Sequence, residues 1–385
     1  MAQSPSPERI RAALDGVLPK VQKPTRYIGI ERNLIRKPWQ SAAVRVALAF
    51  PDAYEIGMSH QGTRILYHLI NRREDALAER TFAPMPDMAQ ALRSTGLPLY
   101  TLESYRSLGD FDVVGISLQS ELNYINVPYL LDLAGIPRRA SRREQDEPII
   151  LGGGPCTANP EPVADFFDAI LIGDAEPALD EILDVIRDAR RDGIERTETL
   201  RRLARVRGVY VPTLYHWSPR STDEPARWRG SDGSDPRPVQ RVWAERLNPA
   251  DQPGVPIVPF ADVIQDRLGM EIMRGCTQGC RFCQAGYWYR PVREHDPAKV
   301  VERVEKQIDE TGFEEVGLLS LSTADYSQVE PLVYHLADAL QERRVSVNLP
   351  SLRADAFSVG LAEAVSRVRK SGFTFAPETG SDRLR

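Results

Sequence analysis

The sequence predicts an α/β protein built from two parallel-sheet domains. Short apolar segments alternate with segments of helical periodicity along most of the 385 residues. This alternation is typical of parallel strands whose sheet is covered by helices on both faces. An irregular interval rich in Ser, Asp, Gly and Pro separates two such runs. We therefore expect a Rossmann-like or flavodoxin-like doubly wound domain, followed by a partial (β/α) barrel of the TIM type.

Changes in this pattern divide the chain into four ranges. Residues 1–40 form a lead-in segment with prolines, charges and one short helical pattern at 10–17. The doubly wound domain is expected at 41–207. An irregular linker at 208–260 and the barrel at 261–385 complete the chain.

The elements of the first domain follow from apolar runs and apolar periodicity. Strands are expected at 44–50, 112–117, 148–151 and 168–172, and helices at 63–71, 121–133 and 176–190. In the linker, 218–238 is polar and loop-like, whereas 239–243 has the pattern of a strand.

The barrel segment repeats the order of strand and helix. Strands are expected at 268–273, 316–321, 345–349 and 373–376, and helices at 297–310, 329–341 and 357–368, with Asp296 capping the first of these helices. About 120 residues and four strands are fewer than a complete eight-unit barrel requires. We therefore expect the barrel to be incomplete at the C-terminus and the chain to be either an N-terminal fragment or a truncated gene product.

Three cysteines lie on one short loop directly after the first strand of the barrel. Cys276, Cys280 and Cys283 have the spacing Cys-x3-Cys-x2-Cys, which aims three thiolates at a common point and leaves a metal centre one ligand short. Structural zinc sites and electron-transfer clusters normally have four protein ligands. The open coordination position therefore indicates a reactive metal centre. A zinc site completed by His295 or Cys156 is the alternative.

This loop resembles that of the radical S-adenosylmethionine (SAM) superfamily, in which an aromatic residue, here Phe282, precedes the third cysteine. The resemblance implies a 4Fe-4S cluster on the three cysteines, with SAM chelating the fourth iron. It also implies reductive cleavage of SAM to a 5′-deoxyadenosyl radical, which abstracts hydrogen from a substrate. Such an enzyme needs a reductant such as flavodoxin or ferredoxin.

The resemblance extends to residues that would contact SAM. The segment that begins at Ala376 resembles a strand end that approaches SAM, so Glu378 is expected to contact the polar part of the cofactor and Gly380 to permit close backbone approach. Arg353 could pair with the cofactor carboxylate, with a surface salt bridge as the alternative. Residues 320–323, which include Ser322, and Asp325 follow the strand at 316–321, where relatives meet the cofactor amine, although the glycine-rich version of that motif is absent.

The domain order resembles an uncharacterised bacterial family of radical SAM proteins with a cobalamin-binding-like N-terminal half. A cobalamin motif would read Asp-x-His-x-x-Gly, but the residues around His60 are Met-Ser-His-Gln-Gly-Thr. The aspartate and the correctly spaced glycine are missing. We therefore expect His60 to be a loop or helix-start residue, and cobalamin binding stays open.

The residues leave two alternative functions open. One is methylthiotransferase-like or methyltransferase-like modification of RNA or protein, and the other is a non-catalytic iron-sulfur or zinc binding module. The residues do not define the substrate, which could be a small molecule, RNA or protein.

Composition limits the cellular setting. A net charge of −5 offers no bulk attraction to nucleic acid or anionic lipid. Four cysteines, three of them on one loop, exclude a disulfide framework and indicate a reducing compartment. The sequence contains no apolar run of the length that a membrane span needs. We expect a cytoplasmic protein with no membrane partner.

Overall fold

The chain folds into two compact units of mixed α/β structure with parallel sheets. The computed structural model describes residues 4–219, 227–231, 238–350, 352–353, 359–366, 375–381 and 383. Unit 1 comprises Met1–Ile30 and Leu34–Ala244, and unit 2 comprises Glu31–Asn33 and Glu245–Arg385. The segment at 208–260 is therefore divided between the two units.

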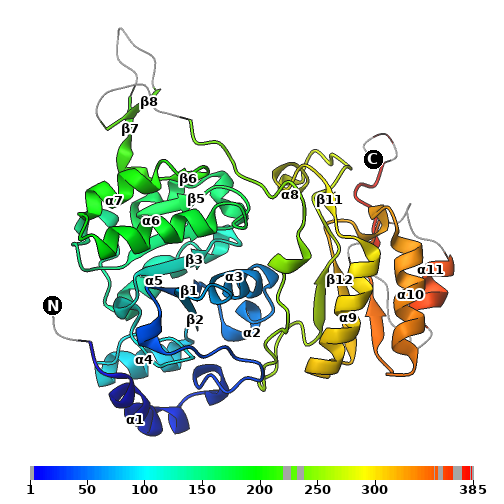
Figure 1. The fold of residues 1–385 in the computed structure, drawn as a ribbon, viewed down its shortest axis with the longest axis horizontal. Helices are drawn as coiled ribbons and strands as arrows, with labels where there is room; N and C mark the ends of the chain where they lie inside the picture. The colour runs from blue at the N-terminus through cyan, green and yellow to red at the C-terminus, as the bar shows by residue number, and fades with distance from the viewer. Residues whose placement is uncertain are drawn as a thin grey trace. The chain divides into compact units, whose positions relative to one another are not determined.

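A six-stranded sheet forms the centre of unit 1 (Figure 1). Its strands are β1 (Val44–Phe50), β2 (Ala76–Phe82), β3 (Val113–Ser117), β4 (Ile149–Gly153), β5 (Ala169–Leu171) and β6 (Val209–Tyr210). Their order is β2-β1-β3-β4-β5-β6; the first five are parallel, and β6 pairs antiparallel with β5. In this order the crossovers reverse direction between β1 and β3, and ligands of open α/β sheets bind at such a switch point. The four expected strands are confirmed, whereas β2 and β6 were not predicted.

Helices cover both faces of this sheet. They are α1 (Pro7–Val17), α2 (Tyr54–Gly57), α3 (Gln61–Asn71), α4 (Pro86–Thr95), α5 (Asn126–Ala134), α6 (Leu179–Arg191) and α7 (Arg196–Leu203). Buried residues of α1, α4 and α5 share one apolar cluster with Ala47 and Ala49 of β1. Helices α3 and α6 also contact β1 but add no residue to this cluster. Since strand side chains alternate between faces, they cover the face that carries Val46 and Leu48.

Two segments differ from the sequence expectations. The lead-in helix α1 buries Ile10, Leu14 and Val17, so it belongs to the core of unit 1. The strand expected at 239–243 is wrong, because only Val242 forms a bridge, to Gly173. A side chain at position 173 would collide with the Val242 carbonyl, and glycine is what allows the approach. The 208–260 segment also contains a hairpin of β7 (Tyr215–Ser218) and β8 (Arg227–Gly230).

Unit 2 is built around a parallel sheet of the order β13-β12-β9. Its elements are β9 (Leu268–Glu271), β10 (Met273–Arg274), α8 (Gln284–Trp288), β11 (Arg293–Glu294), α9 (Pro297–Thr311), β12 (Glu315–Leu319), α10 (Val329–Gln341), β13 (Ser346–Asn348), β14 (Leu352–Arg353), α11 (Val359–Val365) and β15 (Phe375–Ala376). Strands β10 and β11 pair antiparallel, and β14 and β15 pair parallel. The predicted cap of α9 is confirmed, since the Asp296 carboxylate accepts from the Lys299 amide at 3.1 Å. Each helix returns the chain to the same end of the sheet, so the loops after β9, β12 and β13 lie at one edge.

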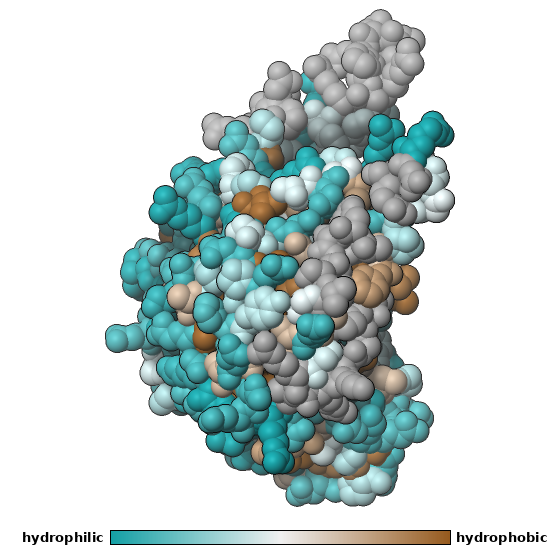
Figure 2. All heavy atoms as spheres, turned by 90° about the vertical axis from the view of Figure 1, so that its right-hand side faces the viewer, coloured by the Kyte–Doolittle hydropathy of each residue, from teal (hydrophilic) through white to brown (hydrophobic). Residues whose placement is uncertain are grey.

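Polar residues dominate one face of the described surface. On the face shown in Figure 2, hydrophilic residues predominate and apolar residues form small separate groups. Among the described helices, none is both long enough and apolar enough to cross a bilayer.

Candidate cluster and cofactor site

The cysteine loop begins at a tight turn at Gly275. This residue has a positive φ of 94°, and a Cβ there would lie 2.7 Å from the Tyr289 carbonyl oxygen and 2.8 Å from that of Pro291. Only glycine fits this turn, which separates the cysteines from the strands β9 and β10. The loop ends at Cys283, the N-cap of α8.

Backbone amides point at two of the three sulfurs. The Gln278 amide donates to Cys276 Sγ at 3.5 Å, and the Gly286 amide donates to Cys283 Sγ at 3.3 Å. Burial raises the pKa of the Cys276 thiol, and the Gln278 amide opposes this effect because a hydrogen-bond donor stabilises a thiolate. All three cysteines are free and partly exposed. The donor set therefore fits an iron-sulfur cluster, in which each thiolate binds a different iron.

The zinc alternative involved His295 and Cys156. Cys156 is buried in the core of unit 1, and His295 is buried in unit 2 near Glu271. Among the described residues, no group of three His, Cys, Asp or Glu side chains could hold a single metal ion.

Side-chain bonds join the loops at this edge of the sheet. Gln278 Nε2 of the cysteine loop donates to both oxygens of Asp325, at 2.9 and 2.8 Å. Asp325 follows β12, and the neighbouring Thr323 hydroxyl donates to the Pro350 carbonyl after β13 at 2.6 Å. The ends of β9, β12 and β13 are thus connected, as expected of parallel strands.

The predicted SAM contact Ser322 lies in this connected region. It is 2% exposed, and its hydroxyl has no hydrogen-bond partner among the described residues. A buried hydroxyl without a partner carries a free-energy cost that a polar ligand could relieve. The neighbouring Leu321 and the Phe282 of the cysteine loop are exposed apolar residues, at 38% and 67%.

The remaining predicted SAM contacts lie on or near the strand pair β14 and β15. Arg353 pairs with Ala376 through the backbone, and its side chain lies outside the described part of the chain. Glu378 follows β15 with a positive φ of 65°. A Cβ built on Gly380 meets no described atom within 4 Å, so the structure shows no close approach that requires glycine there. The SAM contacts of all three residues stay predictions.

The sequence did not predict a polar cluster at the end of β9, just before the cysteine loop. The Glu271 carboxylate accepts from Arg274 Nε at 2.9 Å and Nη2 at 3.0 Å, and from Gln252 Nε2 at 2.8 Å. The bidentate ion pair holds the end of β9 against the residue that precedes Gly275. The Glu-x-x-Arg spacing before the loop was the available signal, but Gln252 is distant in sequence.

His60 is a helix cap, as expected from its sequence context. Its Nδ1 accepts from the Thr63 amide at 3.1 Å at the start of α3, and its Nε2 lies 3.0 Å from Gln119 Oε1. Both ring nitrogens are therefore engaged. A Cβ on Gly62 would lie 2.7 Å from the ring, so glycine at 62 makes room for this cap.

The cap gives a pH-dependent contribution to stability. Burial lowers the pKa of His60 from 6.5 to about 4. The contribution is therefore fully present above pH 6.5 and is lost as the pH falls toward 4. In His60→Asn, asparagine keeps a cap without titrating in this range. Between about pH 7 and about pH 4.5, we expect the variant to gain about 2 kcal/mol relative to the parent, after allowing for partial solvent access to the ring.

Urea unfolding followed by circular dichroism at the two pH values measures this difference. His216→Asn, which changes an exposed histidine of the same unit, is the control and should leave the difference unchanged. Equal pH dependence of the parent and His60→Asn would contradict the prediction.

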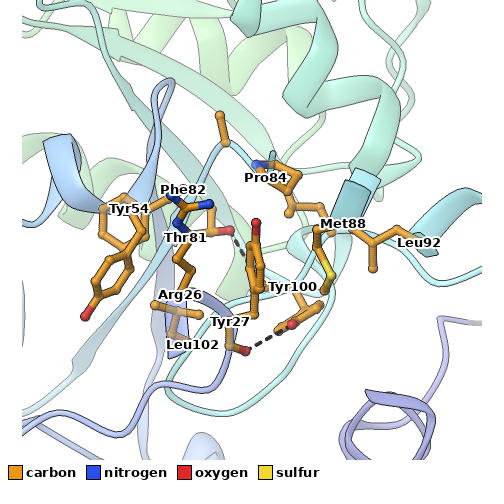
Figure 3. Close-up of a pocket in the computed structure, with 12 residues that line it drawn as sticks. Arg26, Tyr27, Tyr54, Thr81, Phe82, Pro84, Met88, Leu92, Tyr100 and Leu102 are labelled. Carbon is orange, nitrogen blue, oxygen red and sulfur yellow. Dashed lines mark hydrogen bonds between the residues drawn. The ribbon is translucent and has the colours of Figure 1, made fainter. Parts of the chain in front are cut away.

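Unit 1 also contains a small pocket, shown in Figure 3. Tyr27, Tyr54, Phe82, Met88 and Tyr100 are among its lining residues. The space admits roughly one water molecule, so the pocket is too small for a cofactor or substrate.

Comparison with known proteins bears on both units. A family model described as "Radical SAM proteins, N-terminal" matches residues 62–212, and one described as "Radical SAM superfamily" matches residues 270–385. The chain belongs to the radical SAM superfamily. Membership implies a 4Fe-4S cluster and SAM as cofactors. The three cysteines lie within the second matched range.

Individual relatives of this chain are distant. "Uncharacterized protein MJ0966" of Methanocaldococcus jannaschii is 25% identical over 342 residues, which is 88% of this chain and 62% of that protein. A structure of the radical SAM methyltransferase TsrM from Kitasatospora setae with cobalamin and a [4Fe-4S] cluster bound matches with a TM-score of 0.50 and 13% identity, over 84% of this chain and 59% of that one.

A second TsrM structure, with tryptophan substrate and the SAM analog aza-SAM bound, gives a TM-score of 0.49 and 12% identity, over 84% of this chain and 57% of that one. At these identities the similarity concerns the fold alone. The chain spans about three fifths of the length of each of these proteins.

Proposed function

We propose that Cys276, Cys280 and Cys283 bind a 4Fe-4S cluster and that the enzyme uses it to cleave SAM reductively. The observation that carries the proposal is the cysteine loop itself. Three thiols follow β9 at the carboxyl edge of a parallel sheet, two of them receive backbone amide bonds, and the loop lies in a range matched by the superfamily model. When bound, the cluster supplies one electron to the sulfonium of SAM.

The same edge of the sheet supplies groups for the cofactor. We propose that the Ser322 hydroxyl, which has no hydrogen-bond partner among the described residues, and the Glu378 carboxylate contact the polar part of SAM. Arg353 would pair with the SAM carboxylate through its planar guanidinium, and Gly380 would lie beside the cofactor. The burial of Ser322 and the pairing of β14 with β15, which brings the Arg353 and Glu378 segments together, support this assignment.

The reaction beyond SAM cleavage needs two further partners. A one-electron reductant such as flavodoxin or ferredoxin would reduce the cluster, and a reducing, cytoplasmic setting suits both. The substrate class is open among small molecules, RNA and protein. Methyl transfer and cobalamin are described for TsrM. In this chain the candidate ligand His60 has both nitrogens engaged, so we restrict the proposal to SAM cleavage.

Anaerobic reconstitution with iron and sulfide, reduction with dithionite and addition of SAM test this function. We expect methionine and 5′-deoxyadenosine to form, measured by liquid chromatography and mass spectrometry, and neither to form without reductant. A strictly anaerobic preparation that contains stoichiometric zinc and no iron-sulfur absorbance would overturn the proposal.

A further inference from the structure

One contact of the cysteine loop has no counterpart in the cluster-binding motif. Gln278 lies between the first two cysteines, and its side-chain amide donates to both carboxylate oxygens of Asp325, at 2.9 and 2.8 Å. The two residues are 47 positions apart in sequence. The contact therefore exists only because β9 and β12 are neighbours in the sheet.

Gln278 also connects this carboxylate to a cluster ligand. Its backbone amide donates to Cys276 Sγ at 3.5 Å while its side chain holds Asp325. Gln278 thus forms hydrogen bonds to both the Asp325 carboxylate and the sulfur of Cys276. In the described part of the chain, no Lys, Arg or His forms an ion pair with Asp325. Its carboxylate is held by a neutral amide and, among the described residues, forms no ion pair with a cation.

A fixed negative charge beside an iron-sulfur cluster affects how readily the cluster accepts an electron. Reduction adds a negative charge, and a nearby carboxylate repels it. Net charge and hydrogen bonds to the sulfurs are among the factors that set cluster potentials. The effect depends on position, because a carboxylate that swings into solvent is screened.

We propose that Gln278 is a positioning residue that holds the Asp325 carboxylate beside the cluster loop and so keeps the reduction potential of the cluster low. The inference rests on the proposed function, since it requires the cluster. A low potential suits the enzyme, because the electron must pass from the cluster to a sulfonium that is difficult to reduce.

The test is a potentiometric titration of the reconstituted enzyme without SAM, followed by electron paramagnetic resonance of the reduced cluster. Iron and sulfide are measured first, and every variant should match the parent in cluster content. Asp325→Asn should shift the midpoint potential to a more positive value. Gln278→Ala should shift it in the same direction by less. The double variant should match Asp325→Asn, because Gln278 acts only through the carboxylate.

Two further variants complete the experiment. Asp325→Glu keeps the negative charge and should leave the potential close to that of the parent, and it decides the matter together with Gln278→Ala if Asp325→Asn fails to keep a cluster. Asp309→Asn removes an exposed carboxylate near the C-terminal end of α9, on the opposite edge of the sheet, and should leave the potential unchanged.

The outcomes separate the two proposals. A parent preparation without a cluster would contradict the proposed function itself. Variants that keep the cluster at the parent potential, or single shifts that add in the double variant, would overturn only the role of Gln278 and Asp325.

Discussion

Replacing any one of Cys276, Cys280 or Cys283 with alanine is expected to abolish the 4Fe-4S cluster and all SAM cleavage. The loop offers three thiolates for a cluster whose fourth iron must stay open to SAM, so no spare thiolate can substitute. The fourth cysteine of the chain, Cys156, is buried in the core of unit 1. Each single substitution therefore removes an obligatory ligand.

Iron and sulfide content and the visible absorbance of anaerobically reconstituted protein measure this effect. Cys156→Ala is the matched control and should keep both the cluster and SAM cleavage. Burial raises the pKa of the Cys156 thiol to about 11, so this side chain is a neutral apolar group at neutral pH. A full cluster in any loop variant, or its loss in Cys156→Ala, would contradict the assignment of ligands.

Removal of the Glu103 carboxylate is expected to destabilise unit 1 by about 3 to 5 kcal/mol, the usual effect of breaking a buried ion pair. Glu103 accepts from Arg80 Nε of β2 at 2.7 Å and from the Arg80 amide at 2.7 Å. Both side chains are almost fully buried, at 3% and 2% exposure. Glu103→Leu would remove the Glu103 carboxylate from beside the charged Arg80 guanidinium in the protein interior.

Urea unfolding followed by circular dichroism measures the loss. Asp165→Ala, which breaks the exposed pair with Arg139, is the matched control and should cost less than about 1 kcal/mol. The double variant Arg80→Met with Glu103→Leu should recover part of the lost stability, because it removes the uncompensated charge. Equal effects of Glu103→Leu and Asp165→Ala would show that the buried pair contributes no more than a surface pair.

Local sequence signals predicted much of the fold. The apolar run of β1 and the apolar periodicity of α10 were both predicted with their observed bounds. The Asp296 cap was also predicted, because a cap depends on residues three positions apart. Strand β2 was missed because Glu79 and Arg80 interrupt its apolar pattern and resemble a solvated segment. Both are buried, and their partners Thr101 and Glu103 lie more than twenty residues further along the chain.

The candidate site also combines features that local sequence predicts with contacts between distant residues. Spacing alone identified the cysteine loop as a centre with an open position, since the three ligands lie within eight residues. The position of Ser322 after a predicted strand also indicated this residue as a SAM contact. No sequence pattern indicated the Gln278–Asp325 contact or the support of Glu271 by Gln252, because each joins residues that only the folded chain brings together.

The sequence by itself determined the alternation of strands and helices, the superfamily resemblance and the identity of the expected cluster ligands. These properties depend on residues close together in the chain, where periodicity and spacing act directly. Only the tertiary structure decided the order of the strands, the burial of charged residues on β2 and the carboxylate that lies beside the cluster loop. Those properties depend on contacts between distant segments, which form once strand pairing has placed one loop beside another.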